Sequence, residues 1–218
     1  EPLLLTVAIR LVRLPKKRCV KYVKQWGLII PDLTTQPSAW VKRFSPLIPK
    51  GGFVLDLACG SGRHTQLLAQ NDYLVLAVDR DIKTIQSNLP EDLHSRVQVS
   101  KLDLEGESWP LGDFPQFDGV VVTNYLYRPH LDKLLSILTP GGVLIYETFA
   151  LGNEQFGRPS NPDFLLKPNE LLALVEANSA FQIVSFEQGL VKFPKPASIQ
   201  RICAVKSPLI PLQLNDER

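Results

Sequence analysis

The stretch Val54-Leu-Asp-Leu-Ala-Cys-Gly-Ser-Gly62 is the strongest structural signal in the sequence. Together with Phe53, its first residues form a short, mainly apolar run that is typical of a buried strand, and a helical stretch that ends near Gln70 follows. Glycine adopts positive φ angles easily, so a strand that turns through Gly60 and Gly62 into a helix exposes backbone N–H groups to a ligand. We therefore predict a ligand-binding turn here, in which a side chain at either glycine would obstruct the ligand.

Apolar runs and helical stretches alternate on both sides of this turn. We expect strands over residues 53–57, 73–78, 96–103, 117–123, 143–148, 181–188 and 198–206, helices over residues 38–44, 82–88, 130–138 and 170–177, and a helical stretch after the turn that ends near Gln70. Strands joined by helices form parallel sheets with helices on both faces, whereas the last two strands lack a helix between them and pair antiparallel. The predicted class is a Rossmann-like α/β fold with seven strands, mostly parallel, with the last strand antiparallel.

Length and charge divide the chain into three parts. Its 218 residues, 44% hydrophobic and 21% charged, suit one globular domain with extensions. We expect a basic extension over residues 1–35, a ligand-binding domain over residues 36–207 and a tail over residues 208–218. The net charge is only +2, yet residues 1–27 hold seven basic residues and a single acid. We interpret this arm as a solvated helix face; a nucleic-acid contact and an organelle transit segment are the alternatives.

The cysteines and the apolar runs exclude several classes of protein. Cys19, Cys59 and Cys203 stand far apart, which favours a reducing compartment, so we expect a cytoplasmic protein, with a mitochondrial one as the alternative. The sequence contains no Cys-x-x-Cys pair and no alternation of cysteine with histidine, so we expect no metal site. The run Leu3–Ile9 is far too short to span a bilayer, so no membrane contact is expected. The sequence does not predict an oligomeric state.

The residues after the turn narrow the class of ligand. Asp79 stands 19 positions after Gly60, at the end of the next predicted strand, where a carboxylate accepts hydrogen bonds from ribose hydroxyls. A dinucleotide-binding turn favours glycine or alanine in place of Thr65, so NAD is disfavoured, and no Gly-Lys-Ser/Thr motif for ATP is present. Asp56, inside the first strand, suits a ligand that carries positive charge.

Five motifs, in order, resemble the class I S-adenosylmethionine-dependent methyltransferases. They are Asp56-Leu-Ala-Cys-Gly-Ser-Gly62, Ala77-Val-Asp-Arg80, Leu102-Asp-Leu-Glu105, Phe117-Asp-Gly-Val-Val-Val-Thr-Asn124 and Leu138-Thr-Pro-Gly-Gly-Val-Leu-Ile145. The match extends over some 100 residues, from Val54 to Phe149. Within the family the chain is most similar to small-molecule methyltransferases of the tellurite-resistance type.

The resemblance implies S-adenosylmethionine as the cofactor and assigns its contacts. The residues that it implies are Asp56, Ala58, Gly60, Ser61 and Gly62 for the methionine part, Asp79 and Arg80 for the ribose, Asp103 and Leu104 for the adenine, and Asn124 for the sulfonium end.

The expected reaction is in-line methyl transfer to a small-molecule acceptor. A sulfonium is a good leaving group, so catalysis is mainly placement of the acceptor in a dry site, without a covalent enzyme intermediate. An acceptor that carries a proton needs a base, for which Tyr127 and His130 are the candidates; packing for the tyrosine and a solvated cap for the histidine are the alternatives. Tyr125, Glu147 and Arg158 are candidate substrate residues, although Glu147 is also able to pair with a neighbouring base.

Two other functions stay open. The first is methylation of RNA or another nucleic acid, although Asn124-Tyr-Leu-Tyr127 departs from the Asn/Asp-Pro-Pro-aromatic pattern of members that methylate exocyclic amino groups of bases. The second is a non-catalytic cofactor-binding module. Residues 150–168 are rich in Gly, Pro and Asn and predict a long loop that serves as a lid or contacts the substrate. His64 and His94 are expected at the surface.

Overall fold

The computed structural model describes residues 35–112 and 114–207. The basic arm, with its predicted nucleic-acid contact and its alternative as a transit segment, lies outside the described residues, as does the tail. The division of the chain at residues 35 and 207 therefore stays a prediction.

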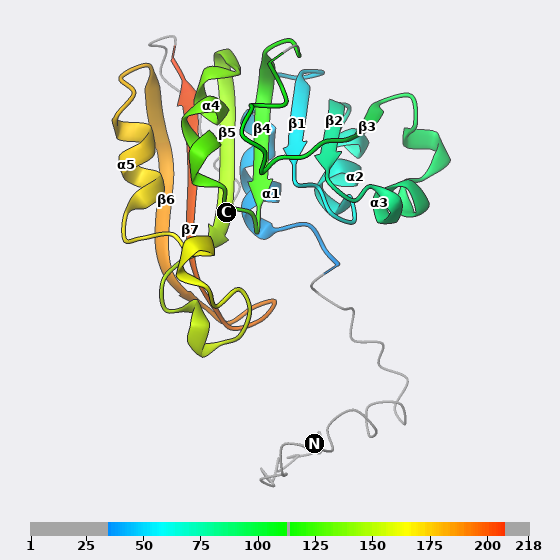
Figure 1. The fold of residues 1–218 in the computed structure, drawn as a ribbon. Coiled ribbons are helices and arrows are strands. Elements are labelled where there is room, and N and C mark those ends of the chain that lie inside the picture. Colours follow the sequence, from blue (N-terminus) through cyan, green and yellow to red (C-terminus); the bar gives the residue numbers. More distant parts are fainter. Residues whose placement is uncertain (1–34, 113, 208–218) are drawn as a thin grey trace, which may run out of the picture. The chain divides into compact units, whose positions relative to one another are not determined.

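One sheet of seven strands, in the order β3-β2-β1-β4-β5-β7-β6, forms the centre of the described part (Figure 1). The strands are β1 (Phe53–Leu57), β2 (Leu74–Asp79), β3 (Val97–Lys101), β4 (Phe117–Thr123), β5 (Leu138–Phe149), β6 (Phe181–Val191) and β7 (Ala197–Lys206). The pairs among β1 to β5 are parallel, whereas β7 is antiparallel to both β5 and β6. The predicted Rossmann-like class, with its antiparallel last strand, is confirmed.

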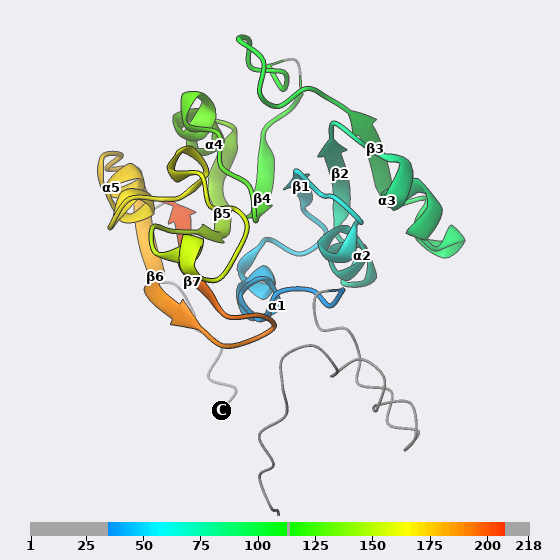
Figure 2. The ribbon, with the colours of Figure 1, turned by 60° about the horizontal axis from the view of Figure 1, so that its bottom comes forward.

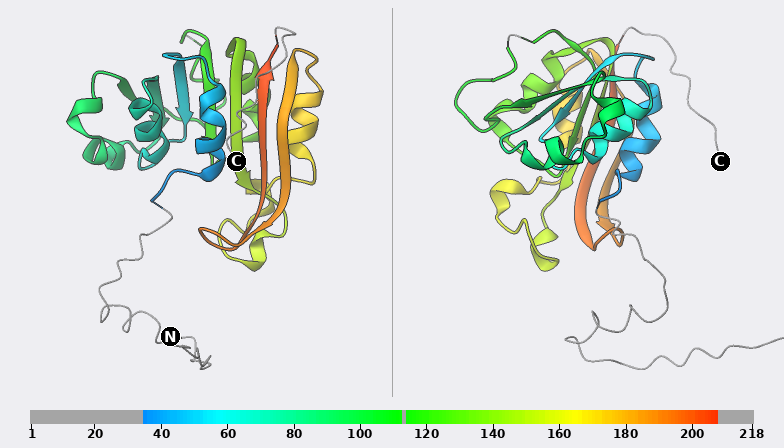
Figure 3. Two further views of the ribbon diagram at one scale, coloured as in Figure 1. Left: turned by 180° about the vertical axis from the view of Figure 1, so that it is seen from behind. Right: turned by 90° about the vertical axis from the view of Figure 1, so that its right-hand side faces the viewer.

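Helices cover both faces of this sheet, as predicted (Figure 3). They are α1 (Ala39–Phe44), α2 (Arg63–Gln70), α3 (Lys83–Asn88), α4 (Leu131–Ser136) and α5 (Glu170–Glu176). Short 3₁₀ turns occupy Ser45–Leu47, Glu91–Leu93, Arg128–His130, Asn153–Gln155 and Pro162–Phe164.

Alternating side chains along the strands produce one apolar core on each face. On one face Val54 packs in a cluster with Trp40 of α1. On the other face Leu55 shares a cluster with Leu134 of α4 and Leu171 of α5. Because successive residues of a strand point to opposite faces, near-continuous apolar strands are what a sheet covered on both sides requires.

The largest difference from the predicted bounds is in β5. We predicted a turn over Thr139–Gly142 and a strand only from Val143, but β5 already begins at Leu138, which pairs with Phe117 of β4 across an irregular register. A side chain on Gly142 would lie 3.0 Å from the carbonyl oxygen of Phe117. The glycine therefore allows β5 to approach β4 closely where we expected the chain to leave the sheet.

The carboxyl ends of β1 and β4 mark the switch point of the sheet, because the chain continues from β1 toward β2 and from β4 toward β5 on opposite sides. Open parallel sheets bind ligands outside such a point. Figure 2 turns this edge toward the viewer, with α1 and α2 beside it. None of the helices in the described part is long and apolar enough to cross a membrane.

Two segments extend beyond the same edge of the sheet (Figure 1). They are residues 150–168 and the tip of the β6–β7 hairpin, residues 189–196, and we call them together the projection. Ser198, at the start of β7, joins them: its Oγ donates to the carbonyl of Leu151 at 2.9 Å, and its N–H donates to Oδ1 of Asn153 at 3.3 Å. The predicted long loop thus lies against the base of the hairpin.

Candidate functional site

The β1–α2 turn is held in a left-handed backbone at three positions. The φ angles are 55° at Ala58, 55° at Gly60 and 81° at Gly62. For an alanine this conformation costs about 1–2 kcal/mol, and strain of this kind concentrates at functional sites. The N–H of Cys59 donates to the carbonyl of Val78 at 3.0 Å, which ties the turn to β2.

The two glycines of the turn have different roles. A Cβ atom built on Gly60 would have no neighbour within 4 Å, so a ligand can approach the backbone there, and Ser61 beside it is exposed. A Cβ atom on Gly62 would lie 2.6 Å from Cγ1 of Ile85. The bare Cα of Gly62 therefore allows α3 to pack on the turn, whereas obstruction of a ligand by a side chain at either glycine stays a prediction.

Asp56 lies buried in β1, directly before the turn. Its Oδ2 accepts a hydrogen bond from Oγ1 of Thr65 at 2.5 Å. Burial raises the pKa of Asp56 to about 6, although the hydrogen bonds from Thr65 and the nearby Arg63 guanidinium lower it. Thr65 thus satisfies a buried acid at the position where a dinucleotide-binding turn favours a smaller residue.

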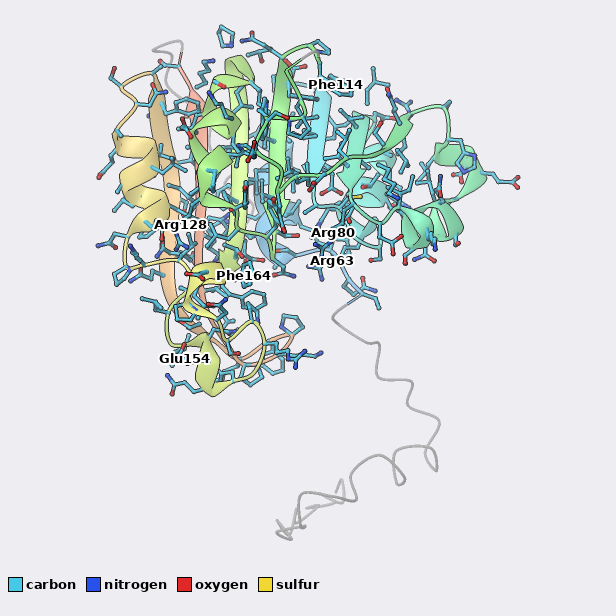
Figure 4. The ribbon with its side chains drawn as sticks, viewed as in Figure 1. Arg63, Arg80, Phe114, Arg128, Glu154 and Phe164 are labelled. Atoms are coloured by element: carbon cyan, nitrogen blue, oxygen red, sulfur yellow. The ribbon has the colours of Figure 1, made fainter. Side chains whose placement is uncertain are left out.

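Asp79 ends β2 and lies against the turn, as the sequence predicted. Its Oδ2 accepts the N–H of Gly60 at 2.9 Å, and its Oδ1 accepts the N–H of Asp81 at 3.0 Å. An ionised carboxylate has about four acceptor positions, so it retains capacity for ribose hydroxyls. Arg80 is exposed, 3.7 Å from Glu105, and Figure 4 shows it at the same edge as Arg63.

The loops after β3 and β4 meet beside the switch point. Asp103 is exposed and its Oδ1 accepts the N–H of Glu105 at 3.0 Å, whereas Leu104 is buried. Oη of Tyr125 donates to the carbonyl of Leu104 at 3.0 Å. Burial raises the pKa of Tyr125 well above its ordinary value, so its hydroxyl is a neutral donor that joins the two loops.

Tyr127 and His130 both face the carbonyl oxygen of Gly106. The oxygen lies 3.1 Å from Nε2 of His130 and 3.5 Å from Oη of Tyr127, and the His130 side chain is buried against Trp109. The structure therefore brings the two predicted bases together, each facing the loop after β3. That loop occupies one hydrogen-bonding position of each of them.

Asn124 and Glu147 lie side by side at the ends of β4 and β5. Asn124 has a φ of 54°, and its N–H donates to the backbone carbonyl of Glu147 at 2.9 Å. The Glu147 carboxylate accepts from Oγ of Ser38 at 2.8 Å and from Nη1 of Arg201 at 3.2 Å. The alternative that Glu147 pairs with a neighbouring base agrees with the ion pair to Arg201.

Sequence reasoning missed His64, which is 1% exposed although we predicted it at the surface. Its Nε2 accepts the backbone N–H of Ser38 at 3.1 Å, and its Nδ1 lies 3.3 Å from Oγ1 of Thr123. Burial and the adjacent Arg63 lower the pKa of His64 to about 3, so its ring is neutral at neutral pH. We call Thr123, His64, Ser38, Glu147 and Arg201 the Ser38 network.

Sequence reasoning also missed Arg128, which anchors the loop of the projection. Its Nε and Nη2 atoms donate to both carboxylate oxygens of Glu170, at 2.6 and 2.9 Å. It also donates to the carbonyls of Asp163 and Leu165, at 2.6 and 2.8 Å. Arg158, the predicted substrate residue of this loop, is exposed instead.

A family model described as a methyltransferase domain matches residues 54–142, from β1 into β5. These residues hold the β1–α2 turn, Asp79, Asp103 and Asn124 in the order that the five motifs predict. Residues 54–142 therefore carry a methyltransferase domain, in agreement with the resemblance to the class I S-adenosylmethionine-dependent family. Among the residues that the structure describes around this methyltransferase domain, no three His, Cys, Asp or Glu side chains form a group that could hold a metal ion.

Two curated proteins are similar to the methyltransferase domain in sequence. A tRNA U34 carboxymethyltransferase of Hahella chejuensis is 35% identical over 118 residues, which are 51% of this chain and 36% of that protein. An uncharacterized methyltransferase of Synechocystis sp. is 29% identical over 149 residues, which are 65% of each chain. The chain therefore spans less than two thirds of the length of either relative.

Solved structures share the fold of the methyltransferase domain. TehB from Haemophilus influenzae is 18% identical, with a TM-score of 0.59 over 75% of this chain and 60% of that one. The 1,6-didemethyltoxoflavin-N1-methyltransferase of Burkholderia thailandensis, solved with its substrate and S-adenosylhomocysteine, is 19% identical, with a TM-score of 0.59 over 81% of this chain and 80% of that one. At these identities the likeness establishes the fold alone.

Proposed function

We propose that the chain transfers a methyl group from S-adenosylmethionine to a small-molecule acceptor. The observation that carries the proposal is the contact between Asp79 and Gly60 at the switch point. It places a carboxylate with spare acceptor positions beside a turn whose backbone is open at Gly60. A nucleoside with an extended cationic tail fits this combination, with the sugar on Asp79 and the tail along the turn.

The remaining cofactor contacts follow from the positions of the loops. In the proposed complex Asp56 supports the α-ammonium end, Asp103 and Leu104 border the adenine, and Asn124 lies near the sulfonium. Ala58, Ser61, Gly62 and Arg80 complete the cradle. S-adenosylmethionine supplies an activated methyl group, so this chain has only to bind it, orient the acceptor in line and exclude water.

A small acceptor is supported by what surrounds the end of β4. Residues 36–38 lie across this edge, fastened through Ser38 to His64 and Glu147. Such a fastened segment favours acceptors that are small enough to pass it. In this proposal Glu147 supports the wall of the site, Tyr125 borders the acceptor and Arg158 contacts it from the loop, while Tyr127 and His130 stay the candidates for a base.

Turnover of methyl-labelled S-adenosylmethionine tests the proposal. The chain is incubated with a panel of small oxygen, nitrogen and sulfur nucleophiles and, separately, with tRNA and single-stranded RNA. We expect label in a small product. Label only in RNA selects the second candidate below, and S-adenosylhomocysteine binding with no transfer selects the cofactor-binding module. A cytoplasmic location is proposed from the free, buried Cys59 and Cys203, and fractionation of cells tests it against a mitochondrial one.

The second candidate, an RNA acceptor, is supported by the projection. Its large apolar side chains Leu151, Phe156, Phe164, Leu190 and Phe193 are 42–76% exposed. Among the described residues, Arg158, Lys192 and Lys195 of the projection are exposed and form no ion pair. Aromatic side chains interleaved with unpaired cations suit a single-stranded nucleic acid. The 35% identical relative acts on tRNA, which agrees with this candidate.

A further inference from the structure

The Ser38 network is an unusual set of groups to bury beside a binding site. His64 is 1% exposed, Thr123 8%, and the Glu147 and Arg201 side chains 15% and 24%. Burying polar and charged groups has a desolvation cost, and apolar side chains of the same volume often give equal or greater stability. The network therefore has a role beyond packing: its directional hydrogen bonds fix the positions of the residues that it joins.

The bonds of His64 determine where its proton lies. The backbone N–H of Ser38 is a donor, so Nε2 of His64, 3.1 Å away, has to be the acceptor and carries no proton. The single proton of the neutral ring is then on Nδ1, which donates to Oγ1 of Thr123 at 3.3 Å. One imidazole thus links the segment before α1 to the end of β4.

The network touches both the turn after β1 and the end of β4, the two strands whose carboxyl ends mark the switch point. His64 follows Gly62 of the β1–α2 turn by two residues, and Thr123 directly precedes Asn124. Ser38 also donates through Oγ to Glu147, whose backbone carbonyl accepts the N–H of Asn124. Beside these bonds, Nη1 of Arg63 donates to the carbonyl of Gln36 at 3.4 Å. Residues 36–38 are therefore fastened from three sides next to the cofactor turn.

We propose that His64 and Glu147 are positioning residues, which hold residues 36–38 as a wall beside the cofactor turn and so close the methionine side of the site to water. The proposal rests on the proposed function. Neither residue touches the cofactor in it: His64 acts through the backbone of Ser38, and Glu147 through the Ser38 hydroxyl. A bound cofactor leaves slowly while the wall is in place and rapidly when it opens.

A pair of substitutions separates the two bonds of His64. In His64→Gln the side-chain oxygen can replace Nε2 and accept the N–H of Ser38. In His64→Asn the shorter amide can replace only Nδ1, so the N–H of Ser38 loses its acceptor. We expect His64→Asn to speed hydrogen exchange at the Ser38 amide and dissociation of S-adenosylhomocysteine, each by about tenfold, the effect of losing one hydrogen bond of about 1.4 kcal/mol. His64→Gln should restore both rates to within about twofold of wild type.

Thr139→Val is the matched control, because it removes a partly buried hydroxyl that bonds to Asp118 at 3.0 Å near the opposite end of β4. It should leave both rates unchanged. If His64→Asn does not fold, Ser38→Ala serves instead: it keeps the backbone bond to His64 but loses the bond from Oγ to Glu147, together with the N–H of Trp40 that Oγ accepts at the start of α1. An unchanged dissociation rate in the variants, or equal rates in His64→Asn and His64→Gln, overturns the proposal that residues 36–38 form a wall. A wild-type chain that does not bind S-adenosylhomocysteine overturns the proposed function instead, while the exchange rate at Ser38 still reports on the wall.

Discussion

The carboxylate of Asp79 accepts the backbone N–H of Gly60 at 2.9 Å, so the acid that ends β2 also holds the turn that follows β1. Replacing it removes a cofactor contact and the support of the turn together. We expect Asp79→Ala to weaken S-adenosylhomocysteine binding about tenfold or more in calorimetric titration, and neither protein to bind NADH tightly. The control is Asp72→Ala, which removes an exposed carboxylate paired with Arg96 near the other end of β2. Tight NADH binding contradicts the assignment.

Alanine substitutions at the two glycines of the turn should differ in their effects: the one at Gly62 mainly lowers stability, and the one at Gly60 mainly weakens cofactor binding. Gly62→Ala puts a methyl group 2.6 Å from Ile85, so we expect about 1–3 kcal/mol of lost stability in urea denaturation beyond the backbone strain of an alanine at a φ of 81°. Gly60→Ala meets no atom, so it should cost only the backbone strain of about 1–2 kcal/mol at a φ of 55°, but weaken S-adenosylhomocysteine binding. Ile85→Ala in the Gly62→Ala background should recover part of the loss. Equal effects of the two alanines on both readouts would contradict this division.

Asp56 predicts a stability that falls as the pH rises. Its pKa is raised from 3.8 to about 6 in the folded chain, so folding favours the protonated carboxyl. The advantage is complete below about pH 4 and is lost as the pH rises through about 6. Relative to Asp56→Asn, which stays neutral, the wild type should lose up to about 3 kcal/mol over this interval in urea denaturation. A difference between the two proteins that does not change with pH contradicts the buried position.

His64 predicts the opposite pH dependence, a stability that falls as the pH falls. Its pKa is lowered from 6.5 to about 3, so the folded chain requires the neutral ring while the unfolded chain takes up a proton. The contribution of His64 to stability is complete above about pH 6.5 and is lost as the pH falls toward 3. The free energy of unfolding of wild type should fall by up to about 1.4 kcal/mol per pH unit relative to His64→Gln. Parallel pH profiles for the two proteins would show that the ring is not held neutral.

Arg128 predicts the stability of the loop in the projection. Its side chain is 31% exposed and makes four donor contacts, two of them to Glu170. Arg128→Ala should cost about 2 kcal/mol and make residues 150–168 sensitive to protease, because the Glu170 carboxylate and the carbonyls of Asp163 and Leu165 lose their donor. Arg96→Ala, which breaks the exposed pair with Asp72, should change stability by less than about 1 kcal/mol. Equal losses in the two variants contradict the anchoring role.

The sequence predicted what local patterns encode. The strands Phe53–Leu57 and Phe117–Thr123 have the bounds that we expected, because each is an apolar run between clear breakers, and Asp79 lies where the spacing from Gly60 placed it. His64 was missed although a signal was present. His64, Thr65, Leu68 and Ala69 are all buried, and this i, i+1, i+4, i+5 spacing marks the inner face of α2.

Arg128 had no such signal. Its partner Glu170 is 42 residues further along the chain, and a lone arginine among tyrosines and a proline does not identify a partner at that distance. The same holds for Ser38 and Glu147, which are 109 residues apart. Contacts of this kind arise when the sheet assembles, so a single sequence predicts the strands but not the side chains that meet across their ends.

Because β7 lies between β5 and β6 in the sheet, the strands cannot all pair in the order in which they are synthesised. β3 pairs with β2, β2 with β1 and β1 with β4, so the pairings around the cofactor turn can form once residue 123 has emerged. β5 waits for residues 197–206 before its second edge is covered. During that delay an uncovered edge strand is open to pairing with other chains, so the nascent protein is vulnerable to aggregation until β7 has emerged.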